Sequence, residues 1–118
     1  MTEPKPIERG HQVPDFDVRT VQGREFRYST IWQRKNLLLV LLPPSGGDGD
    51  YVAELDGRAE AFQQLDAECV ITRGHIPGLH PPAVLLADRW GEVVHVAPAP
   101  EPVRAEVLLE WLEYIQHR

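Results

Sequence analysis

The sequence predicts a single α/β domain in which helices flank a central mixed sheet. Leu37 to Leu42 is apolar at every position, which is typical of a parallel strand covered on both faces. From Tyr51 to Asp66, apolar residues recur at spacings of three and four, which places them on one face of a helix. A chain of 118 residues is long enough to bury one compact core.

An N-terminal β-hairpin is expected ahead of the Leu37 strand. Residues Asp15 to Arg19 alternate between polar and apolar, with Phe16 and Val18 on one side. The segment VQGR then supplies a turn, after which Phe26 and Tyr28 continue the alternation. This pattern favours two short antiparallel strands.

A strand, helix, strand unit is predicted next. Asp50 is placed to cap the start of the helix that spans Tyr51 to Asp66. Gly57 weakens the interior of that helix by roughly 1 kcal/mol relative to alanine, so we expect a bend or a close packing contact there. Glu68 to Thr72 predicts a second central strand, parallel to the first.

The last third of the chain predicts a second hairpin and a final helix. Ala83 to Asp88 and Glu92 to Ala97 flank a short connection, in which Gly91 can take the positive φ of a tight turn. From Val103 to Ile115, apolar residues form a broad stripe on one helical face.

The three tryptophans are expected in two kinds of position. Trp32 and Trp111 lie in helical or amphipathic contexts, which favours the core. Trp90 lies at the predicted hairpin tip, where it either packs locally or is exposed as an interface anchor. Local packing is the favoured interpretation.

Composition excludes several classes of function. The formal net charge is −6 and the basic residues are scattered singly, which argues against a nucleic-acid surface. Neither a membrane span nor a secretory signal is evident, so we expect a cytoplasmic protein with an N-terminal arm (residues 1–12) and one domain (residues 13–118). The single cysteine excludes a CxxC pair, an intramolecular disulfide and a thiolate zinc site.

Four segments carry a resemblance to a known family. They are VPDF at Val13 to Phe16, the Gly23 turn, the apolar strand ending at Pro43 and Pro44, and PPAVLLADRWGEVVH at Pro81 to His95. With the order hairpin, βαβ, ββα, the chain resembles thioredoxin-fold proteins of the peroxiredoxin-like (redoxin) family. The resemblance implies a cis peptide bond at Pro82, which opens the strand facing the active site. The usual helix before that strand is replaced by RGHIPGLHP, so we expect a shortened crossover.

The cysteine that the family uses is missing. The family motif, Pro-x-x-x-Thr/Ser-x-x-Cys, would begin at Pro43 or Pro44 and would place the thiol at Asp50 or Tyr51. Neither side chain can be oxidised by a peroxide and then reduced again, as a sulfur can. The remaining thiol, Cys69, lies in an apolar strand, which favours a buried and inert core residue over a reactive one.

A binding edge is expected where two loops leave the parallel strands, because ligands collect beyond the carboxyl ends of such strands. His75 and His80 with Asp48 and Asp50 offer nitrogen and oxygen ligands for a metal, but solvated side chains are the favoured interpretation. We expect no metal and no cofactor. The candidate residues are Pro44, Ser45, Gly46, Gly47, Asp48, Asp50, Arg73, His75, His80 and Pro82.

The leading functional hypothesis is a redox-inactive binding or assembly module, with a protein partner or a second copy of the chain as its ligand. The first alternative is a peroxiredoxin-like oxidoreductase that uses Cys69 or a partner's thiol. The second alternative is a metal-binding module. Fold alone does not decide among them.

Overall fold

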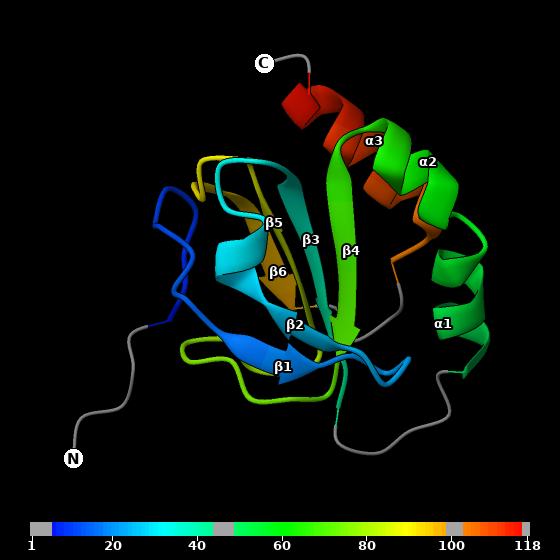
Figure 1. Cartoon of the computed structure of the whole chain (residues 1–118), viewed down its shortest axis with the longest axis horizontal. Coiled ribbons are helices and arrows are strands. Elements are labelled where there is room, and N and C mark those ends of the chain that lie inside the picture. The colour runs from blue at the N-terminus through cyan, green and yellow to red at the C-terminus, as the bar shows by residue number, and fades with distance from the viewer. Residues whose placement is uncertain (1–5, 44–48, 99–102, 117–118) are drawn as a thin grey trace.

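A computed structural model describes residues 6–43, 49–98 and 103–116 of the chain. The described part contains a two-stranded hairpin, a four-stranded mixed sheet and three α-helices (Figure 1). None of these helices has the length and apolar character needed to cross a membrane. The elements are β1 (Asp17–Arg19), β2 (Glu25–Arg27), the 3-10 helix η1 (Tyr28–Thr30), β3 (Asn36–Leu41), α1 (Gly49–Asp56), α2 (Ala59–Gln64), β4 (Ala67–Thr72), β5 (Ala83–Ala87), β6 (Val93–Pro98) and α3 (Ala105–Gln116).

The sheet has the strand order β4-β3-β5-β6, and β3 pairs parallel to β4 and antiparallel to β5. The α/β fold, the N-terminal hairpin and the hairpin of β5 and β6 are thereby confirmed. One prediction was wrong: β4 is an edge strand, not a central one. Its side chains Val70, Ile71 and Thr72 are buried on both faces of the sheet. An apolar run in the sequence predicts that both faces of a strand are buried. It does not predict whether the strand has a hydrogen-bonded neighbour on each side.

Two cores lie on opposite faces of the sheet. Leu37, Leu39 and Leu41 pack into the core beneath the hairpin, whereas Leu38 and Val40 pack into the core beneath the helices. Figure 1 shows the three helices together on one side and the hairpin on the other. The central strand is therefore covered on both faces as predicted, but only one of its covers is helical.

The helix predicted over residues 51–66 is divided into α1 and α2. The break falls at Gly57 and Arg58, where the Arg58 N–H donates to Leu55 O (3.0 Å) in a tighter turn. Gly57 lowers helix propensity at this point, and the same apolar spacing continues on both sides of the break. Asp50 lies inside the first turn of α1 and not before it, where its carboxylate still favours the positive end of the helix dipole.

The crossover from β4 to β5 is short, as expected. No helix forms over residues 73–82. Thr72 at the end of β4 and Ala83 at the start of β5 both lie beside Leu41, on opposite sides of β3. The link therefore crosses one strand at the sheet edge where β4 ends. The Pro81–Pro82 peptide bond is cis, which confirms that implication of the resemblance.

Gly91 shapes the turn between β5 and β6. Its φ is +85°, in the left-handed region that favours glycine. One carboxylate oxygen of Asp88 accepts hydrogen bonds from the N–H groups of Trp90 (3.0 Å) and Glu92 (3.0 Å). The carbonyl of Gly91 accepts a further bond from Val13 N–H (2.8 Å). The turn is thus fixed from within and by the N-terminal segment.

The Gly91→Ala substitution is expected to lower the free energy of unfolding by about 1–2 kcal/mol, the cost of a left-handed L-residue. Its Cβ would also meet Gln12 Oε1 at 2.9 Å and the Tyr28 hydroxyl at 3.1 Å. Urea denaturation measures the loss. Gly57→Ala is the matched control, because its nearest contact is 3.4 Å and its φ is not left-handed. Equal effects of the two substitutions would contradict the assignment of strain to Gly91.

Candidate functional site

The expected binding edge has two loops, the first beginning at Pro43 after β3 and the second at Arg73 after β4. They begin side by side at the carboxyl ends of these strands. Arg73 Nη1 donates to the carbonyl of Pro43 (2.7 Å), and Leu42 N–H donates to Thr72 O (2.8 Å). These bonds join the start of the loop that follows β3 to the start of the loop that follows β4. Of the predicted edge residues, Pro44, Ser45, Gly46, Gly47 and Asp48 lie outside the described residues.

Thr72 anchors the start of the second loop. Its side chain is fully buried, and its hydroxyl donates to Arg19 O (2.7 Å) while accepting from Gly74 N–H (3.0 Å). Arg19 belongs to β1, so one hydroxyl ties the hairpin, the sheet and the loop together. A Cβ on Gly74 would lie 3.2 Å from Val18, which shows how closely this loop approaches the hairpin.

The predicted histidines are exposed on this loop. Ile76 and Leu79 are buried and face each other across an isolated bridge, so they hold the loop to the core while His75 and His80 face solvent. Pro82 is partly buried at the start of β5. Among the described residues, no three His, Cys, Asp or Glu side chains gather closely enough to hold a metal ion.

The start of α1 holds the two positions at which the family motif would place its thiol. Asp50 is exposed, and Tyr51 is buried against the helix-side core. Burial raises the pKa of the Tyr51 hydroxyl to about 12, with smaller contributions from Cys69 and Glu54. The first turn of α1 thus offers a carboxylate and a neutral phenol, and neither supplies the sulfur that a peroxide oxidises and a thiol then reduces.

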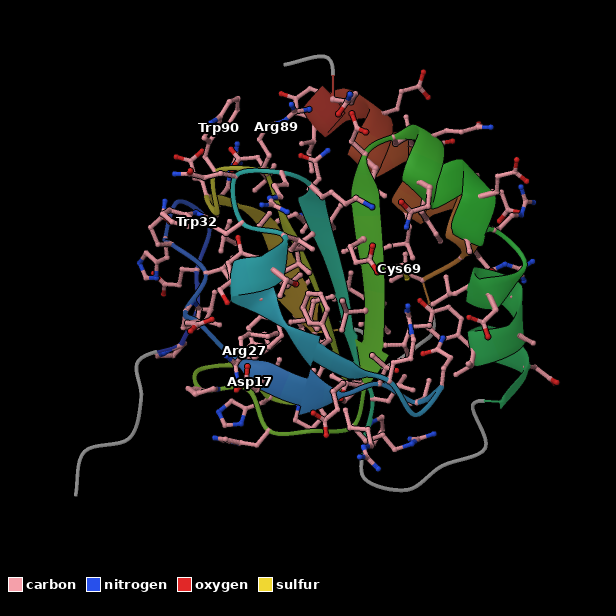
Figure 2. All side chains as sticks on the ribbon, in the orientation of Figure 1. Asp17, Arg27, Trp32, Cys69, Arg89 and Trp90 are labelled. Atoms are coloured by element: carbon pink, nitrogen blue, oxygen red, sulfur yellow. The ribbon has the colours of Figure 1, made fainter. Side chains whose placement is uncertain are left out.

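Cys69 lies at the middle of β4 and packs against the helix-side core (Figure 2). Burial, with smaller contributions from the charges of Asp56 and Glu68, raises the pKa of its thiol to about 12. At pH 7 such a group is almost wholly protonated. Because the thiolate is the nucleophile, Cys69 has the properties of the core thiol that the sequence favoured.

An exposed aromatic pair was not predicted from the sequence. Trp32 is 47% exposed and Trp90 is 63% exposed, so the core position expected for Trp32 and the local packing favoured for Trp90 were both wrong. Trp32 Nε1 donates to Trp90 O (3.2 Å), and the guanidinium of Arg89 lies 5.7 Å from the centre of the Trp90 ring. Figure 2 shows these three residues at one end of the molecule.

The backbone explains why Trp32 is exposed. The chain leaves η1 in tight turns, and Ile31 takes the buried position beside it. Gln33 has a φ of +67°, and its N–H donates to Arg89 O (2.6 Å). The helical or amphipathic context of Trp32 favoured the core, and a left-handed non-glycine residue such as Gln33 gives no signal in the spacing of apolar residues. Trp111 is half-buried on α3, with its ring centre 4.4 Å from that of His95.

Comparison with known proteins establishes the fold. The chain matches no protein-family model and no curated protein. Among solved structures, it is similar to the reduced 2-Cys peroxiredoxin of Plasmodium vivax, with 17% identity over 95% of this chain and 83% of that chain and a TM-score of 0.71. The mitochondrial 2-Cys peroxiredoxin of Plasmodium falciparum is 11% identical over 93% of this chain and 95% of that chain, with a TM-score of 0.74.

A bacterial structure gives the same result. Peroxidoxin BcpB of Mycobacterium tuberculosis is 15% identical over 97% of this chain and 99% of that chain, with a TM-score of 0.67. The thioredoxin-like fold of peroxiredoxins, predicted from the four sequence segments, is confirmed. The single cysteine of this chain lies in β4 and not at the start of α1.

Proposed function

We propose that this peroxiredoxin-like domain acts by binding protein and carries out no thiol chemistry of its own. The observation that carries the proposal is the environment of Cys69, which packs under the helices with its pKa raised to about 12. A peroxidatic thiol must be ionised near neutral pH and reached by peroxide. Cys69 is only partly exposed and is protonated at that pH.

The binding role is supported by what the fold retains. Arg73 and Pro43 fix two loops against each other, and Thr72 fixes the second loop to the hairpin. The ligand we propose is another protein or a second copy of this chain, in a cytoplasmic setting. Exposed aromatic side chains with a neighbouring arginine, such as Trp90 with Arg89, are enriched among residues that anchor protein interfaces.

The test is intact-mass analysis of the native protein after dilute hydrogen peroxide, followed by iodoacetamide. We expect no added oxygen, no disulfide-linked dimer and no alkylation at pH 7. Because the alkylation rate follows the thiolate fraction, it should rise about tenfold per pH unit between pH 8 and pH 11. Protein unfolded in urea is the control, since its thiol has an ordinary pKa and should be alkylated at pH 8.

The oxidoreductase alternative makes the opposite prediction. Oxygen added to Cys69, or a dimer linked through it, at neutral pH would overturn the proposal. Peroxide consumption that is lost in a Cys69→Ser variant would do the same. The variant is suitable because serine is close in size to cysteine and leaves the β4 backbone unchanged.

A further inference from the structure

The outer edge of β4 has unpaired backbone groups near its middle. Asn36 N–H donates to Asp66 O (2.7 Å), and six residues later Leu42 N–H donates to Thr72 O (2.8 Å). In a parallel ladder this pattern turns the even-numbered residues of β4 toward β3. The N–H and C=O of Cys69 therefore point away from the sheet. The structure gives them no hydrogen-bond partner among the residues that it describes.

One segment of the chain already uses this edge. Val21 N–H donates to Ile71 O (2.9 Å), and Thr20 forms an antiparallel bridge with Thr72. The hairpin turn thus covers the carboxyl-terminal end of β4 as a short added strand. The remainder of the edge stays open because the short crossover leads directly to β5, on the other side of β3.

A cavity of about 190 Å³ lies beside Cys69, between the hairpin turn and the junction of α1 and α2. Leu55, Phe62 and Ile71 contribute its apolar lining. The volume is several times the roughly 30 Å³ of a water molecule and below the roughly 300 Å³ of the smallest drug-sized pockets. It suits a single aliphatic side chain.

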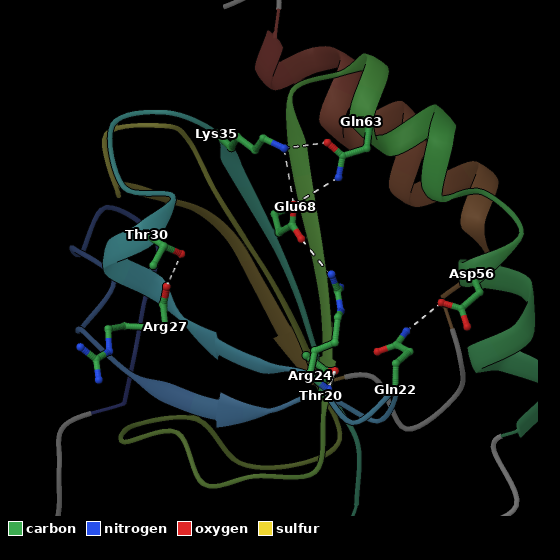
Figure 3. Close-up of polar contacts among 9 residues, drawn as sticks. All are labelled: Thr20, Gln22, Arg24, Arg27, Thr30, Lys35, Asp56, Gln63 and Glu68. Carbon is green, nitrogen blue, oxygen red and sulfur yellow. Dashed lines mark hydrogen bonds and ion pairs between the residues drawn. The ribbon is translucent and has the colours of Figure 1, made fainter.

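The rim of the cavity is polar and carries both signs of charge. Gln22 Nε2 donates to Asp56 Oδ1 (2.7 Å), which links the hairpin turn to the end of α1 (Figure 3). Arg24 forms an ion pair with Glu68 (3.9 Å) on the strand itself. Because Arg24 pairs with Glu68 and the Asp56 carboxylate accepts from Gln22, the rim favours neutral polar neighbours around the side chain that enters the cavity.

We propose that the edge of β4 at Cys69 is a docking site for an extended segment of a partner protein. The segment adds as a short antiparallel strand and exchanges two backbone hydrogen bonds with Cys69. Residues directly opposite each other in such a pair project to the same face of the sheet. The partner residue opposite Cys69 therefore places its side chain on the helix face, where the cavity lies, and an aliphatic residue fits there.

A second copy of this chain cannot supply its own β4 with the two Cys69 residues opposite each other. In a two-fold antiparallel pair centred on Cys69, position 67 of one copy would lie opposite position 71 of the other. Val21 of the same chain already occupies that place through its bond to Ile71. The inference rests on the proposed binding role, but it assigns a surface apart from the contact of Arg73 with Pro43.

The test uses the peptide acetyl-Val-Gln-Thr-amide, which places valine opposite Cys69 and ends before the position that Val21 occupies opposite Ile71. It is titrated to about 5 mM, a range suited to a Kd near 1 mM. We expect shifts of the Cys69 and Ile71 amide signals in NMR spectra and slower hydrogen exchange of the Cys69 N–H. The same peptide with N-methylvaline should produce neither change, because it lacks the N–H that donates to Cys69 O.

Two protein variants complete the test. Ala59 is exposed and lines the cavity, so Ala59→Trp should fill it and abolish the response. Ala53 is exposed on α1 and does not line the cavity, so Ala53→Trp should respond as the unchanged protein does. No response of the unchanged protein, an equal response of Ala59→Trp, or shifts confined to residues 73–82 or Trp90 would overturn the inference. None of these results reports on oxidation of Cys69. The proposed function is tested separately, by whether peroxide oxidises that thiol.

Discussion

The Phe62→Ala substitution is expected to lower the free energy of unfolding by about 3–5 kcal/mol, the usual range for a fully buried ring. Phe62 is 0% exposed and lies in α2, a helix of six residues that packs on β4 and α3. A helix this short is not stable in isolation, so its packing must supply its stability. Removing the ring leaves a cavity between the sheet and the helices.

That loss is a large fraction of the roughly 5–15 kcal/mol by which domains of this size are stable. Urea denaturation followed by far-ultraviolet circular dichroism measures it, as a lower midpoint with an unchanged slope. Gln64→Ala is the control on the same helix, where an exposed side chain should cost less than about 0.5 kcal/mol. A loss below about 1 kcal/mol in Phe62→Ala would show that α2 does not depend on the ring.

The Thr72→Val substitution is expected to cost about 2–4 kcal/mol, although valine has nearly the same shape as threonine. It removes the hydroxyl that donates to Arg19 O (2.7 Å) and accepts from Gly74 N–H (3.0 Å). Both backbone groups lose a partner in a place where water has little access, and each unsatisfied group costs about 1–3 kcal/mol. The hairpin should also open locally, because this hydroxyl bonds β1 to the end of β4.

Two measurements separate these effects. Urea denaturation reports the global loss, and hydrogen exchange of the Val21 amide, which donates to Ile71 O, reports local opening of the hairpin turn. Thr72→Ser keeps the hydroxyl and should retain most of the stability. Thr30→Val removes an exposed hydroxyl that donates to Arg27 O (2.7 Å) and should cost less than about 1 kcal/mol. If Thr72→Val and Thr30→Val were equally stable, burial of the bond would not matter.

The strands and hairpins were predictable because their signals are local. Leu37 to Leu42 is apolar throughout, and Gly91 marks the turn between two short strands. The irregularity at Gly57 was expected as a bend or a close packing contact, but its extent, a division into α1 and α2, was not, since a turn of nearly helical shape keeps the apolar spacing on both sides. Trp32 lies outside the core beside the buried Ile31, and no spacing of apolar residues reports the left-handed backbone of Gln33 that follows it.

The candidate site was predictable to a smaller extent. The meeting of the Pro43 and Arg73 loops followed from parallel strands, whose carboxyl ends share one edge. The open edge of β4 could not be predicted. Apolar side chains indicate that the two faces of a strand are buried, but they do not indicate which of its backbone groups form hydrogen bonds. One partial signal was present: Glu68 interrupts the apolar pattern at the strand that proved to be at the edge, where charged residues discourage unwanted pairing.

The raised pKa of Cys69 also makes the protein a convenient host for site-specific probes. The chain has no other cysteine, and at pH 7 its own thiol is almost wholly protonated. A cysteine introduced at an exposed position such as Ser29 would be the dominant nucleophile for a maleimide dye or spin label. Distances and motions could then be recorded on the natural background, without first removing a residue from the core.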